Sequence, residues 1–339
     1  MASTHMTSHP PTPERIFDTL LAHQQAAALR AALDLDVFTA IAKGAATIPA
    51  LAKETRASER GLRILCDYLV VKGFLTKTGS AYGLTQESAT FLDQRSPAYI
   101  GGMRHFLHLP TFVESAQALT ETVRTGTTQL TGQGSVTPDN PIWVEFARSM
   151  AAMVAPAGQG IAQLLASDPP RRVLDIAAGH GLFGITLAQK FPEANIVALD
   201  WAAVLAVAQE NASKAGVESR YTQLPGSAFE VDFGKDYDVI LVTNFFHHFD
   251  SPTCVQLMKK IHAALAPGGR CVTLEFVPND DRVSPPISAT FAMTMLASTP
   301  AGDAYTFAEY DRMFRAAGFE RNEIHTLPMS PEHVVVSFR

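Results

Sequence analysis

One glycine-rich stretch constrains the fold of this chain more than any other part of its 339 residues. Residues 173–176 form a short apolar run, and a second apolar run follows at 196–199. Between them lies a segment with helical spacing, 182–190, preceded by glycines in a G-x-G-x-x-G pattern: Gly179, Gly181 and Gly184. This order predicts a β-α-β unit of the nucleotide-binding kind, in which the turn brings the backbone close to a ligand at a helix N-terminus.

An acid accompanies each strand of this unit, Asp175 in the first and Asp200 at the end of the second. The glycine pattern with an acid about 20 residues on also fits a dinucleotide site, with Asp200 on the ribose. A carboxylate beside the turn repels a pyrophosphate but attracts the ammonium of S-adenosylmethionine. The pattern from Asp175 to Gly181 therefore favours a methyl donor. The alternatives are a capping or turn acid at Asp175 and a solvated loop acid at Asp200.

Composition and charge exclude several function classes. The chain is 47% hydrophobic and 18% charged, with a net charge of -6 and no basic stripe, so nucleic acid is not expected as a partner. Its Cys residues lie far apart without a C-x-x-C pair, which predicts no disulfide framework, no metal site and a cytoplasmic setting. No apolar run approaches the roughly 20 residues that span a bilayer, so no membrane association is expected. Residues 1–14 are polar and proline-rich, which predicts a disordered N-terminus.

Residues 15–165 are predicted to form a mainly helical domain that begins with a winged-helix unit. The expected helices and hairpin lie at 16–32, 37–43, 48–55, 59–72 and 74–84. A DNA-binding regulator is the alternative, but helix 59–72 is mostly apolar where a DNA reader carries polar side chains for the groove, which suggests that it is buried. We therefore interpret the unit as a packing and dimerisation module. Further helices are expected at 103–125 and 143–165, before Asp168-Pro169-Pro170 breaks the chain.

Residues 166–339 continue the alternation of strands and helices. Further strands are expected at 221–224, 237–243, 270–276, 323–327 and 334–338, and helices at 204–215, 255–265 and 307–317. This alternation predicts an α/β domain with a doubly wound, mostly parallel sheet. Ligands bind such sheets beyond the carboxyl ends of the strands.

The glycine motif, the L-x-P-G-G turn at 265–269 and the F-F-H-H segment at 245–248 together resemble a class I S-adenosylmethionine-dependent methyltransferase. With its helical N-terminal half, the chain resembles the O-methyltransferase family from about Ile16 to its end. That family includes plant caffeate-type enzymes, acetylserotonin methyltransferase and bacterial enzymes of natural-product biosynthesis. The resemblance implies S-adenosylmethionine as donor, S-adenosylhomocysteine as product, a small-molecule acceptor and a homodimer interlocked through the N-terminal halves.

The resemblance also implies a catalytic His after the fourth strand, and His247 matches it. Glu275, at the end of the next strand, matches the carboxylate that flanks this His in the family. His248 stands where the family often has Asp, and we expect it to point elsewhere. A neutral imidazole can take a phenolic proton near neutral pH, and a carboxylate on its other nitrogen fixes the tautomer. The alternatives are a hydrogen-bonded loop His and a plain strand-end acid.

Two segments depart from the family pattern. The second Glu of a G-x-E-R-T-like segment is replaced by Ala304, and Asp303 is a candidate substitute one position away. The Asp of a G-D-x-F segment is replaced by Ser227, which is a weaker hydrogen-bond partner. These changes bear on the acid–base details and on the acceptor. Methylation of carbon or nitrogen, or another use of the sulfonium, therefore stays open beside O-methylation of an aromatic or polyketide-like hydroxyl.

The remaining site residues are expected from their positions alone. Around the donor we expect Trp201, Gly226, Ser227, Phe229, Thr243 and Asn244, with Phe246 and Trp201 flanking the adenine. A planar apolar acceptor suits Met and flat aromatic side chains. For it we expect Trp143, Phe146, Met150 and Met153 on one helix, and Phe291, Met293 and Met295 before the last long helix. Ordinary core packing is the alternative for each of them.

Overall fold

The computed structural model of the chain describes residues 11–151, 154–328 and 330–339. The chain divides into two compact units, residues 1–104 and 105–339. Most of the segment expected to be disordered, and the expected pocket residue Met153, lie outside the described residues. The domain boundary near residue 166 stays a prediction. The two compact units meet at a different position, between Arg104 and His105.

The first unit has the predicted order of helices followed by a hairpin. Its elements are α1 (Glu14–Leu20), α2 (Ala22–Asp34), α3 (Val37–Ala42), α4 (Ile48–Thr55), α5 (Glu59–Val71), β1 (Leu75–Thr78), β2 (Ala81–Leu84), α6 (Gln86–Phe91) and η1 (Gly101–Met103). The single helix expected at 16–32 is interrupted at Leu21. Helix α5 is less enclosed than its composition suggests, because Ile64 and Val71 are exposed while Leu62 and Leu69 are buried.

The helical part that precedes the sheet is more broken than expected. It consists of α7 (Arg104–Leu107), α8 (Pro110–Gln117), α9 (Leu119–Thr125), η2 (Gly134–Val136), α10 (Ile142–Ser149) and α11 (Ala155–Leu164). Pro110 starts a new helix because its ring cannot continue the preceding one, and Gly126 ends α9 in the left-handed conformation. The helices expected at 103–125 and 143–165 are therefore each divided into shorter pieces.

The seven-stranded sheet confirms the α/β prediction. Its strands are β3 (Arg172–Ile176), β4 (Asn195–Asp200), β5 (Tyr221–Pro225), β6 (Tyr237–Thr243), β7 (Leu265–Glu275), β8 (Arg321–Thr326) and β9 (His333–Phe338), in the spatial order β5-β4-β3-β6-β7-β9-β8. The strands β3 to β7 are parallel, and β9 runs antiparallel to both of its neighbours. The turn expected at 265–269 lies inside β7, where the register with β6 shifts.

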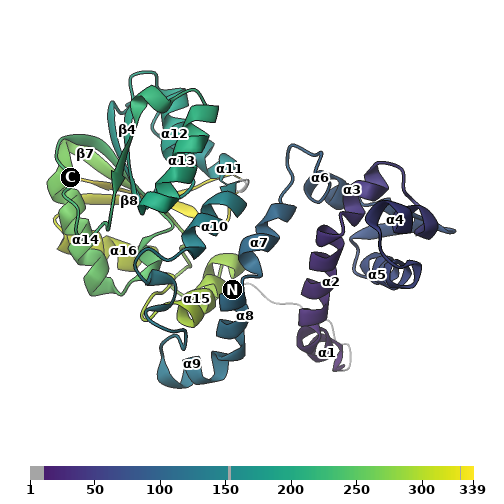
Figure 1. Cartoon of the computed structure of the whole chain (residues 1–339). Helices are drawn as coiled ribbons and strands as arrows, with labels where there is room; N and C mark the ends of the chain where they lie inside the picture. Colours follow the sequence, from purple (N-terminus) through teal and green to yellow (C-terminus); the bar gives the residue numbers. More distant parts are fainter. Residues whose placement is uncertain (1–10, 152–153, 329) are drawn as a thin grey trace, which may run out of the picture. The chain divides into compact units, whose positions relative to one another are not determined.

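Helices cover both faces of this sheet. They are α12 (Leu182–Lys190), α13 (Ala202–Lys214), α14 (Ser251–Ala264) and α16 (Phe307–Ala316), with short turns η4 (Glu218–Arg220) and η5 (Phe246–His248). Helix α15 (Pro286–Ser298) packs against α8 and α9 instead. Successive strand residues face opposite sides: Val173 belongs to the core under α12 and α13, and Leu174 to the core under α14 and α16. Figure 1 shows these two helix pairs on opposite sides of the sheet.

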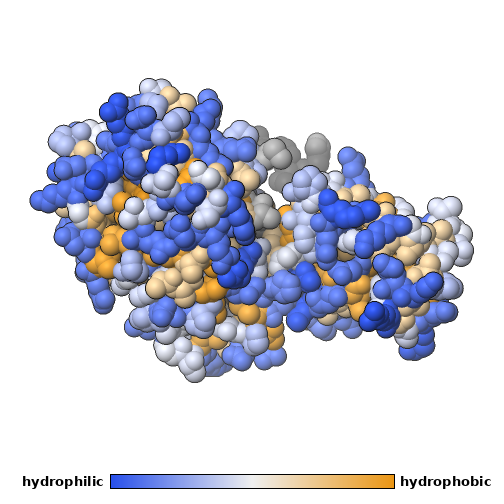
Figure 2. Space-filling view, turned by 45° about the horizontal axis from the view of Figure 1, so that its top comes forward, coloured by the Kyte–Doolittle hydropathy of each residue, from blue (hydrophilic) through white to orange (hydrophobic). Residues whose placement is uncertain are grey.

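The surface has the character expected of this composition. The view in Figure 2 is mostly hydrophilic, with smaller hydrophobic areas between the polar side chains. Exposed large apolar side chains gather on α1 and the following turn, where Ile16, Phe17, Leu20 and Leu21 are each at least 47% exposed. Within the described ranges, no helix is both long and apolar enough to cross a membrane.

Candidate functional site

The acids at the ends of β3 and β4 hold the glycine turn. Asp200 accepts hydrogen bonds from the backbone N–H of Gly179 at 2.8 Å and of Trp201 at 2.7 Å. Asp175 accepts from the N–H of Gly184 at 3.1 Å. Both carboxylates therefore stabilise backbone N–H groups of the segment that leads into α12 and α13.

Burial distinguishes the two acids from ordinary surface carboxylates. Asp175 is fully buried, which raises its pKa to about 7, and burial raises the pKa of Asp200 to about 6. The Oδ1 atom of Asp175 is buried and has no hydrogen-bond partner within the described ranges. Asp175 is therefore enclosed behind the glycine turn, whereas Asp200 is only partly buried.

The two glycines that begin the motif have different surroundings. Both adopt positive φ, 56° at Gly179 and 75° at Gly181. A Cβ atom at Gly181 would lie 2.5 Å from the hydroxyl of Tyr221, so this position admits no side chain. A Cβ at Gly179 would meet nothing closer than 3.9 Å, and Phe146 lies across this opening at 4.0 Å. The turn is thus tightly packed behind Gly181 and open in front of Gly179.

His180, between these glycines, was not selected from the sequence. Its ring stacks on Phe146 at a centroid distance of 6.3 Å, and its Nδ1 accepts a hydrogen bond from the N–H of Leu182. Burial lowers the pKa of His180 to about 4, so the imidazole is neutral at pH 7. The neutral ring carries its proton on Nε2 because Nδ1 is an acceptor.

The loop after β5 is held together by its own polar groups. Gly226 donates its N–H to the carbonyl of Asp200 at 3.0 Å, and Ser227 accepts from the N–H of Phe229 at 3.2 Å. Phe229 is 39% exposed and its ring contacts Phe249 edge-to-face at 5.0 Å. The Ser227 hydroxyl thus stabilises the turn that presents the Phe229 ring at the surface.

The residue that follows strand β6 has a left-handed backbone conformation. Thr243 is buried, and Asn244 has a φ of 54°. The Oδ1 atom of Asn244 is buried without a partner among the described residues. A buried amide oxygen without a donor is costly, so it marks a place where a ligand can supply one. Phe246 does not lie with Asn244 where a ligand could reach it, because its fully buried ring packs edge-to-face on Phe314 in the core.

His247 and Glu275 form a buried pair. The Nδ1 atom of His247 lies 2.6 Å from Oε2 of Glu275, and the two side chains are 5% and 0% exposed. The other carboxylate oxygen accepts from the backbone N–H of Phe245 at 3.0 Å and of His247 at 3.4 Å. Strand β7 therefore supplies one carboxylate that binds both the imidazole and the backbone of the loop after β6.

The electrostatics of this pair favour a neutral imidazole. Burial lowers the pKa of His247 and raises the pKa of Glu275, while the backbone N–H donors favour the ionised carboxylate. A neutral His247 donates Nδ1–H to Glu275 and keeps the lone pair on Nε2. Within the described ranges, no residue forms a hydrogen bond with that Nε2. The arrangement can accept a proton from a hydroxyl placed next to the ring.

The expectation that His248 points elsewhere is wrong. Its ring lies 4.2 Å from that of His247 and 5.1 Å from that of Trp143, and it is also buried. Its Nδ1 has no partner among the described residues. Burial, and then the neighbouring His247, lower the pKa of His248 well below its usual value, so it is neutral as well.

Several residues expected to line the acceptor pocket surround the two imidazoles. Phe291 on α15 contacts His247 edge-to-face at 4.9 Å and stacks on Phe276 at 4.2 Å. Trp143 contacts both His248 and Phe146, and donates its indole N–H to the carbonyl of Ser135. Met295 is a buried residue of α15, and Met150 is a half-buried residue at the end of α10, without a described contact to the imidazoles.

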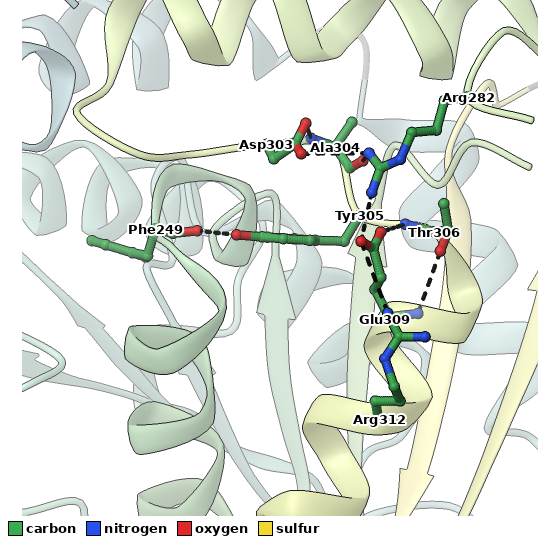
Figure 3. A network of polar contacts seen from close by, with 8 residues as sticks. All are labelled: Phe249, Arg282, Asp303, Ala304, Tyr305, Thr306, Glu309 and Arg312. Atoms are coloured by element: carbon green, nitrogen blue, oxygen red, sulfur yellow. Dashed lines mark hydrogen bonds and ion pairs between the residues drawn. The ribbon is translucent and has the colours of Figure 1, made fainter. Parts of the chain in front are cut away.

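The segment that lacks the second Glu contacts the His247 loop through its backbone. The N–H of Asp303 donates to the carbonyl of His247 at 3.0 Å. The carboxylate of Asp303 is 41% exposed and lies 3.4 Å from Arg282, as Figure 3 shows. Ala304 is buried, with 1% of its surface exposed. Asp303 therefore does not bring a carboxylate to His247.

Glu332 was not selected from the sequence but lies near the same loop. A hydrogen bond with Asn244 and another with Ser330 accompany burial, which raises its pKa to about 7. The register of β7 and β9 pairs Glu275 with His333, the next residue. The available signal was an acid two residues before the strand expected at 334–338. The structure shows no metal-binding group of three or more His, Cys, Asp or Glu side chains in the residues it describes.

Comparison with protein families gives two matches. Residues 118–320 match the O-methyltransferase domain, and residues 16–94 match the O-methyltransferase dimerisation domain. The two matches follow one another along the chain and together contain the acids, the glycine turn, His247 and Glu275.

Individual proteins agree with these matches. The tetracenomycin polyketide synthesis 8-O-methyl transferase of Streptomyces glaucescens is 28% identical over 92% of this chain and 93% of its own length. A crystal structure from Nostoc punctiforme, provisionally assigned as an O-methyltransferase, is 49% identical with a TM-score of 0.96 and covers 97% of this chain and 100% of its own. Human N-acetylserotonin methyltransferase in complex with SAM has the same fold, with 20% identity and a TM-score of 0.84 over 98% and 99% of the chains.

Proposed function

The chain belongs to the O-methyltransferase family, and we propose that it methylates a hydroxyl of a small aromatic or polyketide-like molecule with His247 as general base. S-adenosylmethionine is the donor in this family of enzymes. The polyketide acceptor of the Streptomyces relative and the aromatic acceptor in the name of the human enzyme support the acceptor class.

The observation that carries the proposal is the buried pair of His247 and Glu275. The 2.6 Å contact fixes the imidazole, and Phe291 covers it at 4.9 Å. A base whose ring is held by a carboxylate and flanked by flat apolar side chains suits a planar acceptor with one acidic hydroxyl.

The residues at the carboxyl ends of β3, β4 and β6 fit the donor. The open side of Gly179 admits a close ligand, Asp200 supplies negative charge, and the unpartnered Oδ1 of Asn244 is an acceptor for a polar or cationic group. We propose Asp175, Gly181, Trp201, Gly226, Ser227, Phe229 and Thr243 as the remaining donor-site residues.

The pair has a defined role in the reaction. When bound, S-adenosylmethionine supplies an activated methyl group and leaves as S-adenosylhomocysteine. His247 removes the proton of the acceptor hydroxyl at Nε2, and the resulting imidazolium is stabilised by Glu275 through Nδ1–H. Trp143, Phe146, Met150, Phe291 and Met295 are the proposed acceptor-binding residues. They orient the acceptor and exclude water from the imidazole.

The test is the variant His247→Ala. Removing a general base lowers kcat by about 10²–10⁴-fold while the calorimetric Kd for S-adenosylmethionine changes little. A screen of phenolic acceptors, followed by released S-adenosylhomocysteine, identifies the substrate for this measurement. An equal loss of donor binding would contradict the role of His247 as base.

Methylation of carbon or nitrogen on a similar molecule is the second candidate. The observation that favours it is Asp303, whose carboxylate faces Arg282 and leaves His247 with the single carboxylate of Glu275. An already activated nucleophile needs no base. If His247→Ala retains full turnover on the true acceptor, this second function is correct.

We also propose a homodimer formed through the N-terminal unit. The dimerisation match at 16–94 and the exposed apolar side chains of α1 support it. Light scattering measures the mass, and Phe17→Glu is expected to weaken the dimer.

Free, buried cysteines support a cytoplasmic location. We expect no salt-dependent DNA affinity from the winged-helix unit, which a mobility shift assay checks.

A further inference from the structure

The loop that carries His247 is short and has few backbone hydrogen bonds of its own. It contains the 3₁₀ helix η5, whose backbone hydrogen bonds extend over a single turn. Such turns have poorer hydrogen-bond geometry than an α-helix. The position of the imidazole relative to Glu275 therefore depends on contacts from outside the turn.

Residues 302–305 supply those contacts on both sides of the turn. The N–H of Asp303 donates to the carbonyl of His247 at 3.0 Å, and the hydroxyl of Tyr305 donates to the carbonyl of Phe249 at 2.6 Å. Gly302 packs so closely on the His247 carbonyl that a Cβ would collide with it. Figure 3 shows the Tyr305 side chain extending from its segment to the Phe249 carbonyl.

The segment is itself fixed from the opposite side. The Arg282 guanidinium lies 2.5 Å from Glu309, 3.4 Å from Asp303 and 3.5 Å from the carbonyl of Ala304. Glu309 also accepts from the N–H of Thr306, whose hydroxyl caps α16 in return. Arg282 lies in the loop before α15, so one network joins this loop to the segment that supports His247 (Figure 3).

We propose that residues 302–305 form a backbone clamp that positions His247 against Glu275, with Tyr305 as its positioning residue and Arg282 as its anchor. This inference rests on the proposed function. The clamp supports the His247 loop by hydrogen bonds to its backbone carbonyls. A second carboxylate would instead support the imidazole ring directly. Tyr305 touches neither reacting group and acts only through the loop.

The test compares two variants that each lose one hydrogen bond from a tyrosine to a backbone carbonyl. Tyr305→Phe removes the bond to Phe249, and Tyr237→Phe removes a 2.8 Å bond to Phe233 at the far end of β6. We expect Tyr305→Phe to lower kcat about tenfold, with the donor Kd unchanged, because one hydrogen bond no longer holds the loop. We expect Tyr237→Phe to keep the wild-type kcat at a similar loss of thermal stability.

The pH profile separates positioning from stability. Loosening the turn admits water, which raises the pKa of His247 toward the ordinary value of about 6.5. The acidic limb of kcat is then expected to move to higher pH in Tyr305→Phe and to stay in place in Tyr237→Phe. Equal profiles in the two variants would overturn the clamp.

A measurement that does not depend on methyl transfer tests the clamp separately from the proposed function. The low-field proton resonance of His247 Nδ1, assigned by its absence in His247→Ala, is expected to broaden in Tyr305→Phe alone. If it stays sharp there, the clamp is wrong. Should the wild type show the sharp resonance and the Tyr305 effect but transfer no methyl group, the clamp stands and the proposed function falls.

Discussion

The variant Glu275→Gln tests the proton-transfer role of the buried pair with the smallest change in shape. In the wild type, one carboxylate oxygen accepts from the backbone N–H groups of Phe245 and His247, and the other binds Nδ1 of His247. A glutamine keeps its oxygen at the two N–H donors and must place its NH₂ group against Nδ1. The imidazole then becomes an acceptor at Nδ1 and carries its proton on Nε2.

The expected loss follows from this change of tautomer. Loss of a hydrogen bond to a charged partner costs about 1.5–3 kcal/mol, which is about a 10–150-fold decrease in rate. The wrong tautomer adds to this, since a comparable change in a Ser-His-Asp triad lowers kcat about 10⁴-fold. We therefore expect Glu275→Gln to lower kcat by about 10²–10⁴-fold.

The assay is steady-state release of S-adenosylhomocysteine with a saturating phenolic acceptor, beside calorimetry of donor binding. Glu323→Gln on the edge strand β8 is the control, because its side chain is 39% exposed and lies outside the site. The donor Kd is expected to stay within about threefold of the wild type in both variants. A kcat for Glu275→Gln within threefold of the wild type would refute the reasoning.

Three further outcomes follow from the same geometry. Asp303→Asn should leave kcat within about twofold, because the backbone N–H of Asp303, and not its carboxylate, contacts His247. A tenfold loss of kcat in steady-state kinetics would show that the carboxylate does act on His247. Gly181→Ala should cost about 2 kcal/mol or more in urea unfolding and weaken donor binding in calorimetry, whereas Gly179→Ala faces open space and should cost less. His180 has a folded-state pKa of about 4, below the value of about 6.5 in the unfolded chain, so the unfolded state takes up the proton first as pH falls. The wild type should therefore lose about 2 kcal/mol more than His180→Asn between pH 7.5 and pH 5 in urea unfolding, and parallel pH dependences would contradict this.

The sheet could be predicted from the sequence because its local patterns are strong. The apolar runs at 173–176 and 237–243 admit little but buried parallel strands, and the glycine turn between β3 and α12 has a known geometry. The pairing of His247 with Glu275 was expected from the family resemblance, and it is possible because the loop after β6 lies beside the end of β7, the parallel neighbour of β6.

Other features depend on tertiary contacts that no local pattern reveals. Pro110 and the break after Ser149 divide helices that hydropathy alone would continue. His248 was expected to point away, but a 3₁₀ turn leaves both imidazoles buried side by side. In the sequence alone, Tyr305 looks like an ordinary apolar residue, and only the fold brings its hydroxyl to the Phe249 carbonyl.

Strand β9 has a consequence for the order in which the protein matures. It is the antiparallel neighbour of β7 from Arg270 to Glu275. While the chain is being synthesised, β7 presents an open edge until residues 333–338 have left the ribosome. The strand that carries Glu275 therefore gains its antiparallel neighbour only after β3 to β6 and their helices have been synthesised.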